Sequence, residues 1–419
     1  MRRLALTLLV LLGLAAAASL VAEAQDKVTL KFLSVARGDP RRQAALLTIE
    51  RFEKANPTVK VEFVEVPFDQ YFQKLSVALA SGTGVDVFDV DSPLVASYGY
   101  QDVLLPLDEY VDKRDWEDFL DQERQIATYG GKILSLPWSS SSQAVFYNLD
   151  MLKEAGITPP SSPDKRWTWA QLLDAAKKLT KKAPDGTTAV WGFVVEQVDR
   201  PYQILPLLQS NGAQALSPDG AKTAGFLNSP EAVEALQFYG DLYGKHAVSP
   251  KKPIPDAFGR GQAALFLANS PHVNVLKRLF PQTKWAVTPH PVFKKPVTPT
   301  GAWHAGVYKK TRHPREAAAF ALAYSNVQQA KDNFKIMNYM PVRKSTFDAF
   351  PEEFQQLPNS LFYYEITHTA IRRPGTPAWR EYEDLLRAAI RNVIDGGDAK
   401  RELDTAVARI DAVLARYKK

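Results

Sequence analysis

Hydrophobic and polar positions alternate or recur at helical spacing along most of the chain. Residues 28–33 and 59–66 alternate and are rich in β-branched residues, which predicts strands. Residues 43–54 carry apolar side chains at helical spacing, and a second helix is expected from Asp69 to about Ala80. A third apolar run covers residues 85–90. This β-α-β-α-β order predicts a mostly parallel sheet with helices on both faces.

Helix signals recur after residue 168, and the C-terminal third of the chain is expected to be largely helical. Thr168 and Gln171 have the spacing of a capping box that begins a helix ending near Leu179. Further helix starts are predicted after Ser229, at Pro314, at Pro377 and at Asp398.

The first 24 residues have the pattern of a signal peptide. Arg2 and Arg3 precede an apolar stretch over 4–21, and Ala22 to Ala24 fit a small-x-small cleavage site. We therefore expect an exported chain that starts near Gln25. A membrane anchor that is never cleaved is the alternative interpretation. The chain has no cysteine, which excludes lipid attachment at cysteine, disulfides and thiol catalysis.

Charge and motifs exclude several further functions. The 52 Lys and Arg residues exceed the 46 Asp and Glu residues only slightly and are spread along the chain, so no nucleic-acid partner is expected. The sequence contains no P-loop, no H-E-x-x-H motif and no G-x-S-x-G motif. The six histidines are scattered, and we predict neither a metal site nor a cofactor.

Two kinds of residue suggest a binding site for carbohydrate. Asp91 follows the third predicted strand, where a parallel sheet meets its ligands. Trp138, Tyr202 and Trp303 stand in polar, loop-like contexts, Trp138 beside four serines. Sugar rings have apolar faces and polar edges, so a sugar site needs flat aromatic rings together with fixed polar groups.

The order of short motifs resembles the extracellular solute-binding proteins of ABC importers, in the carbohydrate-binding cluster that includes maltose-binding protein. The matching stretches span the mature chain in the same order. They are Phe52–Val61, Tyr71–Leu75, Ala80–Gly82, Asp86–Asp91, Leu105–Asp108, Phe146–Gly156, Trp167–Trp169, Phe258–Ala264 and Met340–Arg343.

The resemblance implies an α/β fold of two lobes, the type II periplasmic-binding-protein fold, which closes on a solute about a hinge. Lobe 1 is expected over 25–138 and 299–326, and lobe 2 over 139–298 and 327–419. The chain would cross between the lobes near 138–142, near 298–302 and near 324–326.

The resemblance also implies a function and a set of ligand-binding residues. The function would be that of a monomeric periplasmic receptor that delivers a small solute to the permease subunits of an ABC transporter, with no enzymatic activity. The expected ligand-binding residues are Arg37, Asp39, Tyr71, Asp91, Trp138, Ser140, Ser141, Tyr202, His272, Gly301, Trp303, Arg343 and Arg373.

The chain departs from its relatives at Ser270-Pro271-His272, where they often have Gly-x-Trp. An imidazole would then replace a stacking indole, which favours a smaller or more polar solute than a maltodextrin. We expect a neutral oligosaccharide or polyol. Glycerol 3-phosphate or a related phosphodiester, held by Arg37, Arg343 or Arg373, is the alternative.

An exported carbohydrate-active enzyme is a further alternative. A glycosidase requires two carboxylates across the scissile bond, and the sequence analysis identifies one cleft acid, Asp91.

Overall fold

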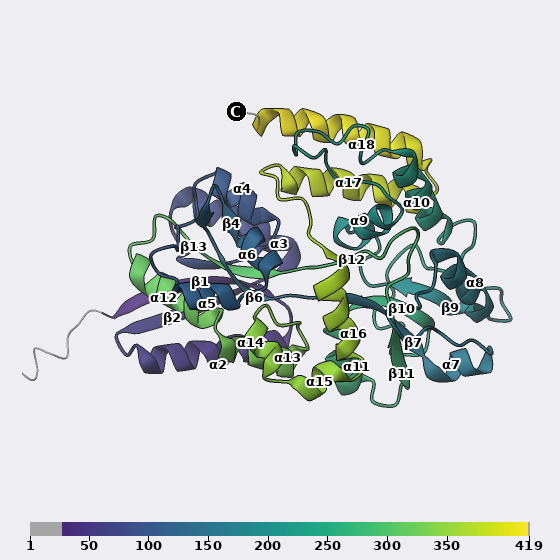
Figure 1. Cartoon of the computed structure of the whole chain (residues 1–419), viewed down its shortest axis with the longest axis horizontal. Helices are drawn as coiled ribbons and strands as arrows, with labels where there is room; N and C mark the ends of the chain where they lie inside the picture. Colours follow the sequence, from purple (N-terminus) through teal and green to yellow (C-terminus); the bar gives the residue numbers. More distant parts are fainter. Residues whose placement is uncertain (1–26, 418–419) are drawn as a thin grey trace, which may run out of the picture.

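The computed structural model describes residues 27–417 and has two lobes, each built around a five-stranded sheet (Figure 1). The signal peptide expected over residues 1–24 lies outside the described residues. Within residues 27–417, no helix is long and apolar enough to cross a membrane.

The sheet of lobe 1 is mixed. Strand β1 pairs in parallel with β2 and β3, and β13 then runs antiparallel between β3 and β6. The strand that returns from lobe 2 therefore lies beside the strand that ends in Asp91. The order is β2 (Val59–Pro67), β1 (Val28–Ala36), β3 (Val87–Asp91), β13 (Trp303–Val307) and β6 (Leu136–Ser139).

The sheet of lobe 2 is also mixed, with β9 and β10 parallel and the other pairs antiparallel. Its order is β11 (Trp285–Thr288), β7 (Gln143–Asn148), β10 (Ala263–Asn269), β9 (Thr188–Val195) and β8 (Lys181–Lys182).

Helices and short hairpins cover both sheets. Lobe 1 has α2 (Asp39–Ala55), α3 (Phe68–Ser81), α4 (Leu94–Tyr100), α5 (Lys113–Asp118), α6 (Asp121–Ala127), the hairpin β4 (Thr128–Tyr129) and β5 (Lys132–Ile133), α12 (Pro314–Tyr324), α13 (Val327–Met337) and α14 (Lys344–Asp348). Lobe 2 has α7 (Leu149–Glu154), α8 (Trp169–Leu179), α9 (Pro201–Ser210), α10 (Pro230–Asp241), α11 (His272–Leu279), α15 (Pro351–Gln355) and α16 (Asn359–Tyr364). The C-terminal segment has the π-helical turn η1 (Glu365–Thr369), β14 (Ala370–Ile371), α17 (Trp379–Ile394), α18 (Ala399–Leu414) and a last turn, η2 (Ala415–Tyr417).

Local sequence signals explain several helix ends. The capping box of Thr168 and Gln171 forms with both hydrogen bonds, and the Ser229 hydroxyl accepts from the backbone N–H of Ala232. Gly82 ends α3 in the left-handed conformation, with φ of 69°. Helix α3 begins at Phe68 rather than being capped by Asp69, so the Phe68 ring lies at the start of the helix.

Three segments connect the lobes. The first joins β6 to β7, and the second joins β12 (Thr298–Pro299) to β13; both run through the centre of the molecule (Figure 1). The third crossing comes later than the expected position near 324–326. Helix α13 packs on α2 of lobe 1, whereas α16 packs on β7 of lobe 2. Residues 327–337, which the sequence analysis placed with lobe 2, contact α2 of lobe 1 and also α11 of lobe 2.

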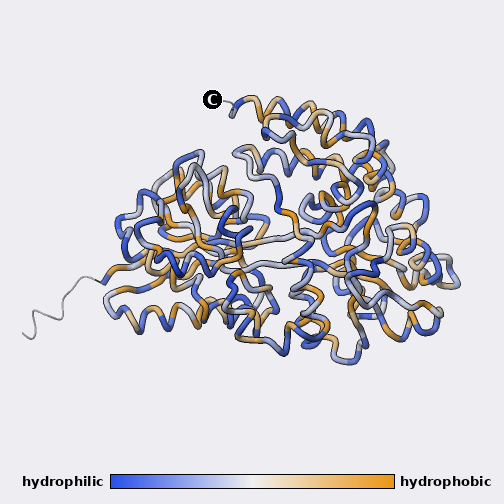
Figure 2. Tube along the Cα trace, viewed as in Figure 1, coloured by the Kyte–Doolittle hydropathy of each residue, from blue (hydrophilic) through white to orange (hydrophobic). Residues whose placement is uncertain are grey.

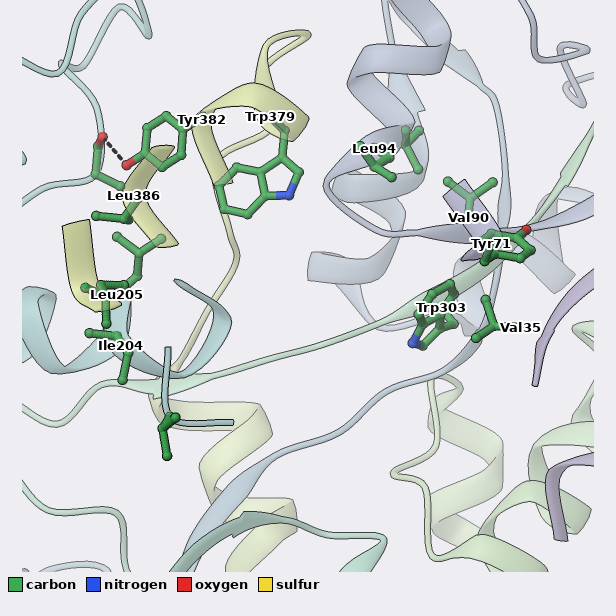
Figure 3. Packing of buried hydrophobic residues seen from close by; sticks show 14 of the residues in the cluster. Val35, Tyr71, Val90, Leu94, Ile204, Leu205, Trp303, Trp379, Tyr382 and Leu386 are labelled. Atoms are coloured by element: carbon green, nitrogen blue, oxygen red, sulfur yellow. Dashed lines mark hydrogen bonds between the residues drawn. The ribbon is translucent and has the colours of Figure 1, made fainter. Parts of the chain in front are cut away.

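Hydrophobic and hydrophilic residues recur along the chain of both lobes (Figure 2), and the buried apolar side chains pack together in their cores. In lobe 1, Val35, Tyr71 and Val90 pack near Trp303, and in lobe 2 Leu205 lies near Leu386 of α17 (Figure 3). The amphipathic helices α17 and α18 pack on each other and on α10, and α17 also contacts α4 of lobe 1. Helix α17 thus contacts elements of both lobes.

Candidate functional site

A cavity of about 240 Å³ lies between the two lobes, next to the crossing segments. Lobe 1 supplies Phe68, Asp91 and Trp303, and lobe 2 supplies Glu196 and Tyr202. Seven of the residues expected from the sequence line this cavity: Arg37, Asp91, Ser141, Tyr202, Gly301, Trp303 and Arg373.

The aromatic floor of the cavity is built from three rings. Trp303, at the start of β13, has 8% of its surface exposed and lies edge-on to Phe68, with 6.5 Å between ring centres. The third ring is Tyr202 on α9, which is also 8% exposed. These rings offer flat apolar surface from both lobes.

An ion pair joins the end of β3 to the C-terminal segment. Arg373 donates to both carboxylate oxygens of Asp91, from Nη1 at 2.9 Å and from Nη2 at 2.5 Å. Burial alone would lower the pKa of Arg373, but the neighbouring Asp91 raises it above its usual value. Asp91 is therefore engaged by a guanidinium, and any ligand contact shares it with Arg373.

The Tyr202 ring is held in place by a short polar network. Its hydroxyl donates to Asn269 Oδ1 at 2.6 Å and lies 3.0 Å from Ser141 Oγ. Glu196 Oε2 in turn accepts from the Asn269 side chain at 2.6 Å. Burial raises the pKa of Tyr202, so the phenol stays protonated and keeps its donor.

Gly301 allows the second crossing segment to approach Tyr202 closely. A Cβ atom at this position would lie 2.8 Å from Tyr202 Cε2 and 3.2 Å from Ser141 Oγ. The backbone N–H of Gly301 donates to the carbonyl of Ser141, and Ser141 Oγ donates to the carbonyl of Gly301, which links the two crossings. A side chain at 301 would thus push the ring out of place.

A second cavity, of about 610 Å³, adjoins the first and shares Arg37, Pro271 and Tyr339 with it. Asp39 lines this second cavity, in the first turn of α2. Lobe 2 contributes Lys277 from α11. The cleft is therefore longer than the space around Trp303.

Four of the expected residues lie outside the cleft, in the interior of the protein. Tyr71 is fully buried and donates to the backbone carbonyl of Asp89. Trp138 is 2% exposed and lies 3.7 Å from the Arg41 guanidinium inside lobe 1. Tyr71 lies on the buried face of α3, and Trp138 lies on β6 with its side chain toward the core, so both face the interior instead of the cleft.

Ser140 and Arg343 have structural contacts. Ser140 Oγ donates to Glu123 Oε1 at 3.1 Å and lies 3.0 Å from Thr300 Oγ1, which links the first two crossings. Arg343 is 1% exposed and pairs with Asp115 at 2.8 Å and Asp118 at 3.2 Å. The expected roles of Tyr71, Trp138, Ser140 and Arg343 as ligand contacts therefore do not fit their positions.

His272 faces a third cavity, of about 150 Å³, inside lobe 2. Its ring lies edge-on to Phe266, with 4.9 Å between ring centres, and Nδ1 is 3.9 Å from Glu196 Oε1. The preceding residue, Pro271, lines the cleft instead. The expected imidazole platform is thus absent from the cavity that holds Trp303.

Sequence reasoning missed several residues of the cleft. Glu196 and Asn269 stand at the ends of the parallel strands β9 and β10, the same signal that identified Asp91. Glu383 lies on the otherwise apolar face of α17, where burial raises the pKa of its carboxyl. The other missed residues are Phe68, Gln197, Arg200, Pro271 and Tyr339.

Within residues 27–417, no group of three or more His, Asp or Glu side chains is arranged to hold a metal ion.

Comparison with known proteins gives a consistent family match. The profile of the family described as "Bacterial extracellular solute-binding protein" matches residues 39–330. A solved ABC substrate-binding protein of Listeria monocytogenes, in complex with cycloalternan, superposes with a TM-score of 0.81 at 24% identity. That superposition covers 93% of this chain and 100% of the other.

Two further comparisons cover most of the chain. A solute-binding protein of Thermotoga lettingae bound to α-D-tagatose has a TM-score of 0.81 at 22% identity, over 92% of this chain and 100% of that one. The sn-glycerol-3-phosphate-binding periplasmic protein of Salmonella paratyphi A is 22% identical over 97% of both chains.

Proposed function

The chain belongs to the family of bacterial extracellular solute-binding proteins, and from this premise we propose that it captures a sugar for an ABC importer. In this proposal the exported protein acts as a monomer in the periplasm, closes its lobes on the solute and delivers it to the permease subunits of the transporter.

The observation that carries the proposal is the composition of the cavity between the lobes. Phe68, Tyr202 and Trp303 supply ring faces, and Asp91, Glu196 and Asn269 supply polar groups around them. A pyranose requires this combination, because its C–H faces stack on aromatic rings while its hydroxyls need fixed partners. The solved relatives with bound cycloalternan and tagatose support a carbohydrate ligand.

The dimensions of the cleft favour an elongated solute. The 240 Å³ cavity adjoins the 610 Å³ cavity through Arg37, Pro271 and Tyr339. A ligand that fills the first space can therefore continue into the second. This supports an oligosaccharide over a single small polyol.

Calorimetry with a panel of neutral sugars tests the proposal, combined with solution scattering. Binding should occur to at least one oligosaccharide and should reduce the radius of gyration as the lobes close about their crossing segments. A protein that binds no saccharide, or that binds one with no change in the radius of gyration, would contradict capture by closure.

The enzyme alternative requires a separate test, because the cavity holds more acids than the sequence indicated. Asp91, Glu196 and Glu383 all line it. Asp91 is paired with Arg373, and Glu196 accepts hydrogen bonds from Asn269. We propose that these carboxylates bind the solute without cleaving it. Incubation with candidate glycans should yield no new products by mass spectrometry.

Glycerol 3-phosphate remains the second candidate, because a relative of that name matches almost the full length of the chain. Of the three arginines expected to hold its phosphate, Arg343 lies outside the cleft and Arg373 is paired with Asp91. Arg37 alone of the three lines the cavity without a carboxylate partner among the described residues.

A further inference from the structure

Two arginines from opposite lobes pack against the same aromatic ring in the cleft. Arg37 follows β1 of lobe 1, and its guanidinium carbon lies 5.1 Å from the centre of the Phe68 ring. Arg200 precedes α9 of lobe 2, and its guanidinium carbon lies 4.7 Å from the same ring centre. Arg37 also lies 4.8 Å from the Trp303 ring. Both cations are thus positioned by aromatic rings inside one cavity.

Neither guanidinium has a hydrogen-bond acceptor among residues 27–417. Arg373 in the same cavity differs, because it donates to both oxygens of Asp91. A ring face stabilises a cation, but it does not satisfy the five N–H donors of a guanidinium. The donors of Arg37 and Arg200 are therefore available to a ligand.

Arg200 is partly buried and Arg37 is exposed, so the desolvation cost falls mainly on Arg200. Burial lowers the pKa of Arg200, and Glu383 offsets this effect only in part. Partial desolvation of a guanidinium costs free energy, and a paired anion offsets that cost. An anionic ligand group at this position would supply the missing partner.

The adjoining cavity adds further cationic side chains next to Arg37. Lys277 and Arg278 line it together with Arg37, and none of the three has an ion pair among the described residues. The one acid of that lining is Asp39, which lies in the first turn of α2, where a carboxylate stabilises the helix.

We propose that the natural solute carries an acidic group, a carboxylate or a phosphate ester, that binds Arg37 and Arg200 together. The inference rests on the proposed function, in which the cleft binds a sugar, and it replaces the neutral solute expected from the sequence with an acidic one. Because the two arginines come from different lobes, the anion contributes to closure as well as to affinity.

Matched pairs of acidic and neutral probes test the inference by calorimetry. The pairs are glucuronate with glucose, digalacturonate with maltose, glucose 1-phosphate with methyl glucoside, and glycerol 3-phosphate with glycerol. At least one acid should bind tenfold or more tightly than its neutral partner, on the order expected for charge-assisted hydrogen bonds. Its affinity should fall as salt rises. Whether that acid is a carboxylate or a phosphate identifies the group.

Variants then assign the effect to the two arginines. Arg37→Gln and Arg200→Gln should each weaken binding of that acid by about tenfold or more. The exposed Arg312 lies outside both cavities, and Arg312→Gln should change affinity less than about twofold. Melting curves without ligand verify that the variants fold. If Arg200→Gln does not fold, Arg200→Lys keeps the charge and should still lose the bidentate contribution.

The outcomes separate this inference from the proposed function. If neutral sugars bind as tightly as their acidic partners, and Arg200→Gln has the wild-type affinity for the acidic probe, the inference of an anion site is contradicted. The proposal of sugar capture then stands. If glycerol 3-phosphate binds and no sugar does, the anion site stands and sugar capture is wrong. Binding of no probe contradicts both.

Discussion

Trp303 and Asp91 lie directly opposite each other in the antiparallel strands β13 and β3. Paired residues of neighbouring strands project from the same face of a sheet, and both residues line the cavity between the lobes. The flat ring and the carboxylate thus reach the cleft side by side. This arrangement requires the second crossing segment to return to lobe 1 as β13, next to β3.

Trp303→Ala should weaken binding of the preferred solute by more than about tenfold, because it removes a stacking surface from a closed site. Trp303 is 8% exposed and packs in the core of lobe 1, so the free energy of unfolding should also fall, by about 3 kcal/mol. Trp303→Phe keeps an aromatic ring, so its losses of affinity and of free energy of unfolding should both be smaller. Calorimetry and urea unfolding measure the two effects, and an unchanged affinity for Trp303→Ala would exclude stacking.

Asp91→Asn should lower the free energy of unfolding by about 3 kcal/mol, because it leaves the buried guanidinium of Arg373 without its partner. The double variant with Arg373→Gln should recover part of that loss. A double-mutant cycle by urea unfolding measures the coupling. If the two single losses simply add, the pair contributes no coupling energy.

Gly301→Ala should weaken ligand binding by about tenfold or more, because the new Cβ would displace the Tyr202 ring and its hydrogen bond to Asn269. Gly244→Ala is the matched control, since a Cβ at position 244 meets no atom within 4 Å. Calorimetry measures the affinity of both variants for the ligand. Equal affinities would show that the ring can move without loss.

Arg343→Met should reduce stability without changing affinity for the solute. The side chain is 1% exposed, while its partners Asp115 and Asp118 are partly exposed, so we expect a loss of about 2 kcal/mol. Urea unfolding measures a structural role of Arg343, and calorimetry on the same preparation measures a role in ligand binding. A loss of affinity at unchanged stability would return Arg343 to the binding site.

His290 should make the protein less stable in mild acid. Burial lowers the pKa of His290 to about 4, from an ordinary value of 6.5, although Glu365 opposes the shift. Between these two values the unfolded chain binds the proton and the folded chain does not, so the free energy of unfolding falls as pH falls. At pH 5 this contribution amounts to about 2 kcal/mol.

The control for this prediction is His290→Asn, which has no titrating ring. Its stability should depend less steeply on pH between about 6.5 and 4 than that of wild type, by urea unfolding at each pH. Parallel curves for the two proteins would mean that His290 does not titrate differently on folding.

The sequence alone determined several helices and strands and the family. Hydrophobic alternation predicted β1 and β2, helical spacing predicted α2, and Thr168 with Gln171 predicted the start of α8. These signals are local, because a strand or helix forms from residues that are neighbours in the chain. Asp91 and Trp303 could be proposed for the same reason, one at a strand end and the other in a Gly-containing crossing.

Only the tertiary structure decided which polar and aromatic residues face the cleft. Trp138 and Arg343 had the right residue types, but they lie against Arg41 and Asp115 in the interior. Arg200 and Glu383 carried no sequence signal of their own, and they reach the cavity because α9 packs on β12 and α17 packs on α9. A residue type specifies what chemistry is possible, whereas its direction depends on strand register and on packing between segments far apart in the chain.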